Sequence, residues 1–388
     1  MQNRRGPGRF FQEMDDEITE LIPPEEVTKE VFAEWRSPRR GAANPERLDN
    51  PVWQWLFESK WTAFAATDHF QEETAYELGP GWCHSRFGQS ETDLGDGRTV
   101  FLAGEHEDFY DPDFFIYNDV TIRHCDGSLE FFGYPVDDFP PTDFHSATLL
   151  EDGILLIGNL GYIADRRPGE TQVLKLDTKT WKMVKVETGG DCPGWISDHT
   201  ARLSPDGKSI TASGGRVFLE SGQLVESFDD WKLDLGEMQW SRLTDRKWTM
   251  VEIAPKGDEW LKLYEMRHAL EMEEFDYGDE VRDLMAGSGL EVEDEDLTWK
   301  PPKDRETFAV LYVPPVEHEH VENEDEEDYR NFRIRIDGVI VRYTEESDAV
   351  TLTVEGQLPP EVVDDLIADL MRKLEIVCET EMETIRVC

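Results

Sequence analysis

The chain has 388 residues, of which 38% are apolar, and its 12 tryptophans and 20 phenylalanines are enough for the cores of about two domains. Its 85 acidic and 39 basic residues give a formal charge of −46. Proteins bind nucleic acids and anionic membranes mainly through Lys and Arg at phosphates, so this charge excludes both as partners. It favours a basic protein partner instead. General acidity of a salt-adapted host is the alternative source of the charge.

The five cysteines are scattered and form no CxxC pair, so the sequence indicates neither a zinc ribbon nor a redox pair. The first residues include arginines but lack the apolar region of a signal peptide, and no stretch approaches the length of a membrane span. These features predict a protein of the reduced cytoplasm.

Residues 1–79 are predicted to form an N-terminal arm and an amphipathic helix. In the stretch that begins at Asn50-Pro51, apolar residues recur at helical spacing. They are Trp53, Leu56, Phe57, Trp61 and Phe64. We expect this helix to brace the domain that follows.

One pattern occurs three times between Phe87 and Trp240. Each copy has a strand start, an Asp-Gly turn, an apolar strand that ends in glycine, and a strand that closes on an aromatic residue. The turns recur at intervals of 56 and 54 residues and are Asp96-Gly97, Asp152-Gly153 and Asp206-Gly207. Gln89, His145 and His199 each precede their turn by seven positions. A fixed period near fifty residues is typical of β-propeller blades, which bury their faces by stacking on neighbours.

The copies resemble kelch repeats. The matching features are His-Ser/Thr-Ala before the Asp-Gly turn, the strand ends Ala103-Gly104, Ile157-Gly158 and Gly214-Gly215, and the late aromatic residues Phe131, Trp181 and Trp240. The resemblance covers residues 80–244 and implies a kelch-like β-propeller region. Kelch propellers have five to seven blades. Three copies therefore imply that flanking segments supply further blades, that two chains join, or that the array stays open.

The pattern changes after Thr244. Residues 245–306 are predicted to be an acidic helical linker, with a helix from Trp260 to Phe275. Residues 307–388 are predicted to form a small α+β domain of three or four strands. Its helix is expected from Pro359 to about Leu374, with Val362, Leu366 and Leu370 on one apolar face. The predicted fold class is therefore mainly β, with an α+β C-terminal domain.

Two places in the repeat region are candidate sites. Closely spaced carboxylates suit a divalent cation, and a histidine adds affinity for transition metals. This chemistry predicts a metal site at Glu105, His106, Glu107, Asp108, Asp111 and Asp113, against the alternative of a solvated acidic loop. No other cofactor is predicted. His145 and His199 occupy equivalent repeat positions, and they are either a metal or acid–base pair or structural residues of the repeat.

An acidic run lies in the C-terminal domain and is the predicted surface for a basic partner. It consists of Glu322, Glu324, Asp325, Glu326, Glu327 and Asp328. The sequence has no specific catalytic spacing, so we expect a non-enzymatic interaction scaffold, for example an acidic immunity-type protein that caps a basic partner. The alternative is a carbohydrate-active or metal-dependent enzyme that uses the central face of the propeller. Some kelch propellers are enzymes, such as copper radical oxidases and a sialic-acid epimerase.

Overall fold

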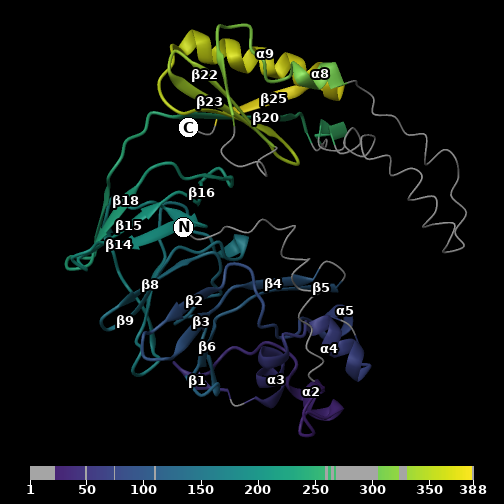
Figure 1. The fold of residues 1–388 in the computed structure, drawn as a ribbon, viewed down its shortest axis with the longest axis vertical. Coiled ribbons are helices and arrows are strands. Elements are labelled where there is room, and N and C mark those ends of the chain that lie inside the picture. The colour runs from purple at the N-terminus through teal and green to yellow at the C-terminus, as the bar shows by residue number, and fades with distance from the viewer. Residues whose placement is uncertain are drawn as a thin grey trace, which may run out of the picture. The chain divides into compact units, whose positions relative to one another are not determined.

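The computed structural model describes residues 22–48, 50–73, 75–108, 111–257, 261–263, 266–267, 305–322 and 330–386. The chain divides into two compact units, Met1–Asp245 (unit 1) and Arg246–Cys388 (unit 2) (Figure 1). The described part is mainly β, as the sequence predicts, and its strands form several sheets in which nearly all pairs are antiparallel. No helix among the described residues is both long and apolar enough to cross a membrane.

Short helices precede the first long strand of unit 1. They are α2 (Lys29–Trp35), α3 (Pro51–Ser59), α4 (Ala63–Phe70) and α5 (Ala75–Leu78). The first three begin where a side-chain oxygen accepts a hydrogen bond from a backbone N–H of the first turn. The capping residues are Thr28, Asn50 and Thr62.

The single helix that the spacing of Trp53 to Phe64 predicts is in fact two helices. Lys60 adopts the left-handed conformation, with φ 57°, and ends α3. Thr62 then accepts a hydrogen bond from the N–H of Ala65 and starts α4. The apolar period continues across this break, so periodicity alone does not reveal it.

Three sheets of unit 1 repeat one architecture, in which four antiparallel strands lie side by side in the order in which they occur along the chain. Sheet 1 consists of β2 (Ser90–Asp93), β3 (Thr99–Leu102), β6 (Asp119–Arg123) and β7 (Leu129–Gly133). Sheet 2 consists of β8 (Ser146–Leu150), β9 (Gly153–Ile157), β10 (Val173–Leu176) and β11 (Met183–Lys185). Sheet 3 consists of β14 (Thr200–Leu203), β15 (Ser209–Ser213), β18 (Trp231–Asp234) and β19 (Gln239–Arg242). Each predicted Asp-Gly turn joins the first two strands of its sheet.

Apolar layers join the three sheets in order. Successive residues of a strand point to opposite faces, and both faces of β9 are buried. Leu156 belongs to a buried cluster with Val100 of sheet 1. Its neighbour Leu155 belongs to a second cluster with Leu233 of sheet 3. Sheet 2 therefore lies between sheets 1 and 3.

The helices cover the face of sheet 1 that is turned away from sheet 2. Phe101 and Phe131 of this face belong to a cluster with Trp53 and Trp82. The rings of Trp53 and Trp82 are stacked with centroids 5.1 Å apart, and Phe131 meets the Trp82 ring edge-on at 5.7 Å. The helical layer thus occupies the place that a preceding sheet would take in a longer array.

The outer face of sheet 3 is polar. One row across the sheet pairs Arg202, Thr211, Lys232 and Ser241 in register. Arg202 and Ser241 are exposed, and the other two are half-buried. A blade that stacks on a further blade needs an apolar face, which these residues do not provide. Among the described residues, the stack of three sheets therefore ends at this face.

A two-residue strand or a single side chain bonds to the outer edge strand of each of the three sheets. The strand β1 (Glu46–Arg47) pairs with β7, and β12 (Gly189–Gly190) pairs with β19. On sheet 2 the Asn44 side chain donates to the Met183 carbonyl at 2.7 Å and accepts from the Met183 N–H at 2.9 Å. Exposed strand edges are prone to unwanted pairing, and these contacts shorten the free edge of each sheet.

The second and third strands of each sheet are joined by an insert. In sheet 1 it is a hairpin of β4 (Glu105–Asp108) and β5 (Asp111–Ile116), which contains the predicted metal residues. In sheet 2 it includes the short helix η1 (Ile163–Asp165). In sheet 3 it contains β16 (Arg216–Phe218) and β17 (Leu224–Glu226), and β16 pairs with both β17 and β13 (Trp195–Ser197).

Unit 2 is an antiparallel sheet with a long helix, α9 (Pro360–Cys378), and a short one, α8 (Arg305–Ala309). Six strands, not the predicted three or four, form the sheet in the order β21-β22-β23-β24-β20-β25. They are β20 (Thr249–Pro255), β21 (Glu319–Val321), β22 (Asn331–Ile336), β23 (Val339–Glu345), β24 (Val350–Val354) and β25 (Met382–Arg386). One of the additional strands is β20, which comes from the predicted linker and pairs with both β24 and β25. The predicted helix Trp260–Phe275 falls largely outside the described residues.

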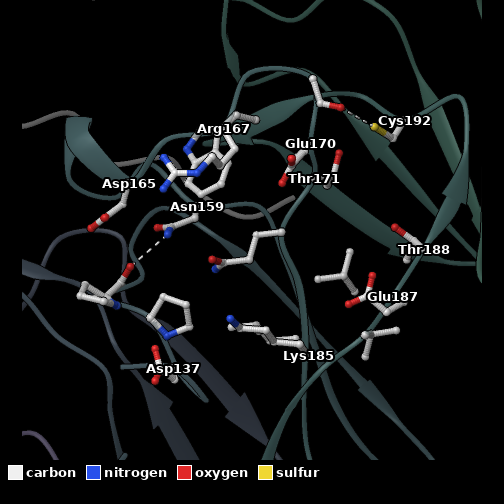
Figure 2. Close-up of a pocket in the computed structure, with 18 of the residues that line it drawn as sticks. Asp137, Asn159, Asp165, Arg167, Glu170, Thr171, Lys185, Glu187, Thr188 and Cys192 are labelled. Carbon is white, nitrogen blue, oxygen red and sulfur yellow. Dashed lines mark hydrogen bonds between the residues drawn. The ribbon is translucent and has the colours of Figure 1, made fainter. Parts of the chain in front are cut away.

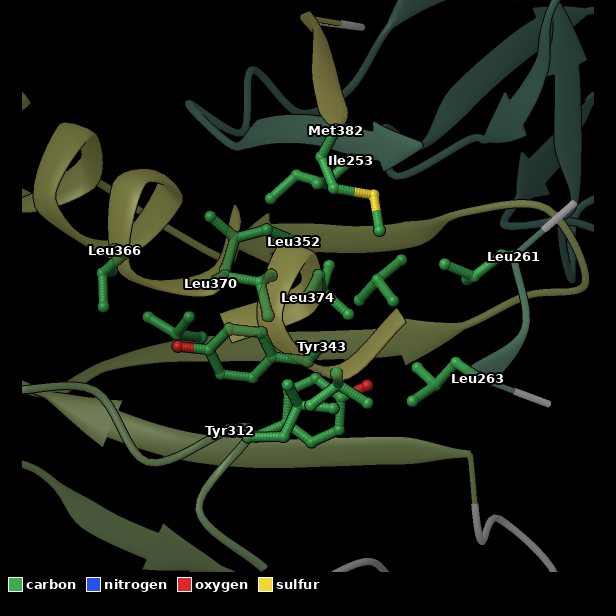
Figure 3. Close-up of a cluster of buried hydrophobic side chains, with 14 of the residues drawn as sticks. Ile253, Leu261, Leu263, Tyr312, Tyr343, Leu352, Leu366, Leu370, Leu374 and Met382 are labelled. Atoms are coloured by element: carbon green, nitrogen blue, oxygen red, sulfur yellow. The ribbon is translucent and has the colours of Figure 1, made fainter. Parts of the chain in front are cut away.

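The predicted apolar face of α9 packs on this sheet. Leu366, Leu370 and Leu374 are at most 1% exposed and share a cluster with Tyr343 and Leu352 of the sheet (Figure 3). The helix continues to Cys378, four residues beyond the predicted end, because Val377 and Cys378 are also buried in this cluster.

Candidate functional site

The two repeat histidines each contact the preceding sheet. His145 Nε2 lies 2.8 Å from Ser90 Oγ of sheet 1, and His199 Nε2 lies 2.8 Å from Ser146 Oγ of sheet 2. Both rings are more than nine-tenths buried. The serines are themselves repeat residues, so each contact links equivalent positions of successive sheets. This geometry agrees with the interpretation of the two histidines as structural residues of the repeat.

Two backbone hydrogen bonds accompany these contacts. The N–H of Phe144 donates to the Gly88 carbonyl, and the N–H of Asp198 donates to the Phe144 carbonyl, at 3.0 and 2.9 Å. All three residues have φ between 47° and 61°. This left-handed conformation is costly for a residue with a side chain, and it turns the chain into the first strand of each sheet. The strand starts of the three sheets are thus held together.

Burial lowers the pKa of His145 to about 3 and that of His199 to about 4. Since the unfolded value is near 6.5, the unfolded chain binds more protons below that pH, and stability is lost as the pH falls. We expect each histidine to lower the free energy of unfolding by about 2 kcal/mol between pH 7 and pH 5. Urea unfolding of the double variant His145→Gln/His199→Gln, which copies Gln89 of sheet 1, should show a flatter pH profile. Equal profiles for both proteins would contradict this assignment.

Acidic side chains gather near the same strand starts. Asp143 is fully buried and precedes Phe144, while Glu105 is half-buried and begins β4. Burial, followed by the nearby Asp143, raises the pKa of Glu105 to about 7. Burial also raises the pKa of Asp143. Asp198 forms an ion pair with Arg216 at 2.9 Å and adds further negative charge near Glu105.

The predicted metal residues are only partly described. Glu105 lies near Asp143, the Nδ1 of His106 lies 3.2 Å from the Ser85 carbonyl oxygen, and Glu107 is exposed. The backbones of Asp108, Asp111 and Asp113 belong to β4 and β5, while their side chains lie outside the described set. Among described residues, no three His, Cys, Asp or Glu side chains are grouped to hold a metal ion.

A groove of about 740 Å³ lies beside sheet 2 (Figure 2). Its wall carries side chains of both signs, among them Arg167, Glu170, Lys185 and Glu187. At one end the Asn159 amide donates to the Pro141 carbonyl at 3.0 Å. The charged and polar lining suits a polar ligand or a peptide loop better than an apolar small molecule.

Only Glu322 of the predicted acidic run is described, and it is exposed directly after β21. Glu324, Asp325, Glu326, Glu327 and Asp328 lie outside the described residues. A hollow of about 370 Å³ lies nearby in unit 2 and is lined by Glu317, His318, Glu319, Arg335, Asp337 and Gly338. An ion pair of 3.5 Å between Arg335 and Glu319 lies within it.

Sequence reasoning missed Asp143, Asn159 and Arg166 as residues of this region. Asp143 N–H donates to Asn159 Oδ1 at 3.0 Å, and Arg166 lies near Asp143. The signal for Asp143 was its position beside Phe144-His145, where the repeat starts. The corresponding signal for Asn159 was its position directly after Ile157-Gly158, one of the repeated strand ends.

No protein-family model matches the chain, and no curated protein is significantly similar to it. Among solved structures, one titled "Structure of YjhT" is similar over 42% of this chain and 52% of that chain. The sequence identity is 14% and the TM-score is 0.32. The chain thus spans about half the length of that structure, and a likeness at this level defines neither fold nor function.

Proposed function

We propose that the protein is a non-enzymatic interaction scaffold that binds a basic protein partner, in the manner of an acidic immunity-type protein. The formal charge of −46 is the observation that carries this proposal. A strongly acidic surface attracts a basic partner before contact and speeds their association. The described cysteines are all free thiols, which agrees with the cytoplasmic setting that we propose for it.

We also propose that the three sheets are kelch-like blades in an open array. The equivalent Asp-Gly turns, the two His–Ser contacts and the shared apolar layers support this proposal. In such an array the polar outer face of sheet 3 and the groove beside sheet 2 remain available to a partner.

The alternative is a carbohydrate-active or metal-dependent enzyme that uses His145 and His199. For that chemistry the ring nitrogens would have to reach a substrate or metal. Both histidines are instead buried, and each Nε2 lies at hydrogen-bond distance from a serine of the neighbouring sheet. This observation favours the scaffold over the enzyme.

Neutralisation of the charges in the acidic run tests the proposal. Once a partner is identified by cross-linking in the source cells, we expect neutralisation of the run to lower its association rate constant by about tenfold. The dissociation rate constant should change by less. Stopped-flow or surface-based kinetics measure both. The changes are Glu322→Gln, Glu324→Gln, Asp325→Asn, Glu326→Gln, Glu327→Gln and Asp328→Asn.

A control variant removes the same number of exposed charges from unit 1. It neutralises Glu34, Glu58, Asp68, Glu151, Glu220 and Glu237, all of which are exposed. We expect a smaller loss of association rate in this control, because its charges do not belong to the proposed surface. An equal loss in both variants would assign the effect to net charge alone and remove the role of the run.

A further inference from the structure

The outer edge of sheet 2 is less covered than the outer edges of sheets 1 and 3. β1 pairs with β7 as a fifth strand of sheet 1, and β12 pairs with β19 as a fifth strand of sheet 3. The described part of the chain places no strand beside β11, the outer strand of sheet 2. Within that part, the Asn44 side chain alone bonds to the outward side of β11, at Met183. Sheet 2 therefore lacks the fifth strand that both of its neighbours carry.

The backbone of β11 has free hydrogen-bonding groups beyond Met183. In an antiparallel pair, every second residue turns its N–H and C=O away from the paired strand. Met183 turns both groups to Asn44, while the Val186 N–H bonds inward to β10. Lys185 lies two positions after Met183, so its N–H and C=O also point outward, and no described residue bonds to them. An edge of this kind accepts an extended segment of another chain.

The groove beside sheet 2 adjoins this free edge (Figure 2). Lys185 and Glu187 are exposed and line it, as does Asp137 from the link between sheets 1 and 2. Val184 is 49% exposed and points to the opposite face of β11, because successive side chains of a strand alternate. A strand added to β11 would therefore place one set of alternate side chains toward the groove and the other set beside Val184.

The charges of the groove favour a basic segment. Four acidic and two basic side chains line it, namely Asp137, Asp165, Glu170 and Glu187 against Arg167 and Lys185. None of the four carboxylates forms an ion pair with another described residue. Unpaired carboxylates attract Lys and Arg. They repel a second copy of this chain, whose formal charge is −46, so the occupant is a different protein.

We propose that the outer edge of β11 and the adjoining groove bind an extended basic segment of the partner protein as an added strand of sheet 2. In the bound segment, basic residues alternate with apolar ones. The basic side chains face Glu187 and Asp137, and the apolar side chains cover Val184. The choice of a basic partner rests on the proposed function. The contact itself belongs to unit 1, whereas the acidic run belongs to unit 2.

Binding of a defined peptide to the full chain tests the proposal. The probe is a short peptide of alternating valine and lysine with blocked ends, and isothermal titration calorimetry measures its Kd. Methylation of the alternate backbone nitrogens that face β11 should raise Kd by about tenfold, because the added strand loses its donors. Methylation of the other set, which points away from β11, should raise it less. Hydrogen exchange should slow in the β11 region when the unmethylated peptide binds.

Lys185→Pro tests the backbone contact from the side of the protein. It removes the outward N–H and keeps the bonds between β11 and β10, and proline is tolerated at such edge positions. It also removes a positive charge, which by itself favours a basic peptide. A rise of Kd by about fivefold is therefore due to the backbone. Lys185→Ala is the matched control, because it removes the same charge, keeps the N–H, and should bind the peptide more tightly.

A second pair of variants tests the charges. Glu187→Gln combined with Asp137→Asn should raise Kd by about fivefold at low salt. Glu151→Gln combined with Asp68→Asn removes the same charges from exposed positions outside the groove and should raise Kd less. Equal effects of the two double variants would overturn the assignment of the basic side chains to the groove.

A peptide that does not bind the wild-type protein would overturn the proposal. So would equal effects of the two methylated peptides, which would indicate electrostatic attraction without an added strand. If Lys185→Pro does not fold, the methylated peptides decide the question. The proposed function fails by a different result, namely an association rate of the partner that does not respond to the acidic run, and peptide binding at β11 is measured without that partner.

Discussion

Replacement of Asp119 by alanine should lower the free energy of unfolding of unit 1 by about 3–5 kcal/mol. The Arg86 side chain is 1% exposed and forms a two-pronged ion pair with Asp119, at 2.5 and 3.0 Å. Trp82 Nε1 donates to the same carboxylate at 2.9 Å. The alanine variant leaves a buried guanidinium without its counter-charge, and this uncompensated charge causes the large effect.

The guanidinium also lies 3.4 Å from the centre of the Tyr117 ring and donates to the Ala103 and Cys83 carbonyls. The Arg86 guanidinium therefore connects the segment before sheet 1 to the end of β3 and the start of β6. Arg86→Met combined with Asp119→Leu should recover part of the loss, since two apolar residues leave no unpaired charge.

The exposed pair of Arg47 and Glu130 is the matched control for the buried pair. The Arg47 side chain is 53% exposed, and we expect Arg47→Ala to cost less than about 1 kcal/mol. Urea unfolding followed by tryptophan fluorescence measures both changes, because Trp53 and Trp82 belong to the adjoining core. Similar losses for Asp119→Ala and Arg47→Ala would contradict the assigned role of the buried pair.

Leu366→Asp should unfold unit 2. The side chain is 1% exposed in the apolar layer between α9 and the sheet, and an unpaired carboxylate placed there costs several kcal/mol. The loss of protection should appear in hydrogen exchange as fast exchange of β22, β23 and β24.

Ile376→Asp on the same helix provides the comparison, because Ile376 is 55% exposed. We expect its exchange and its thermal stability to remain close to those of the wild type. Wild-type behaviour of Leu366→Asp would show that the helix does not pack on the sheet through this face.

Local rules explain which parts of the fold the sequence predicts. The repeated turns at Asp96-Gly97, Asp152-Gly153 and Asp206-Gly207 place the three sheets of unit 1, because hairpins are local structures. The apolar face of α9 is equally local. Two features depend on residues distant in sequence. They are the position of β20 between β24 and β25, and the contact of Asn44 with β11.

In the candidate site, too, local sequence predicts some features, while others depend on residues that are distant in sequence. The repeat position of His145 and His199 predicts that they have equivalent surroundings, which the two serine contacts provide. Asp143 lies near Glu105 although 38 positions of the sequence separate them, and neither residue belongs to a motif that marks the other. Burial raises the pKa of both carboxyl groups, and local pattern does not reveal burial of this kind.

The salt dependence of partner association tests the central proposal most directly. The association rate constant of the wild-type protein with its partner should fall by about tenfold as the ionic strength rises from about 0.01 M to 0.15 M, since the Debye length shrinks from about 30 Å to about 8 Å. The dissociation rate constant should change by less than about twofold. An association rate constant that stays the same across this range would contradict an acidic surface that recruits a basic partner.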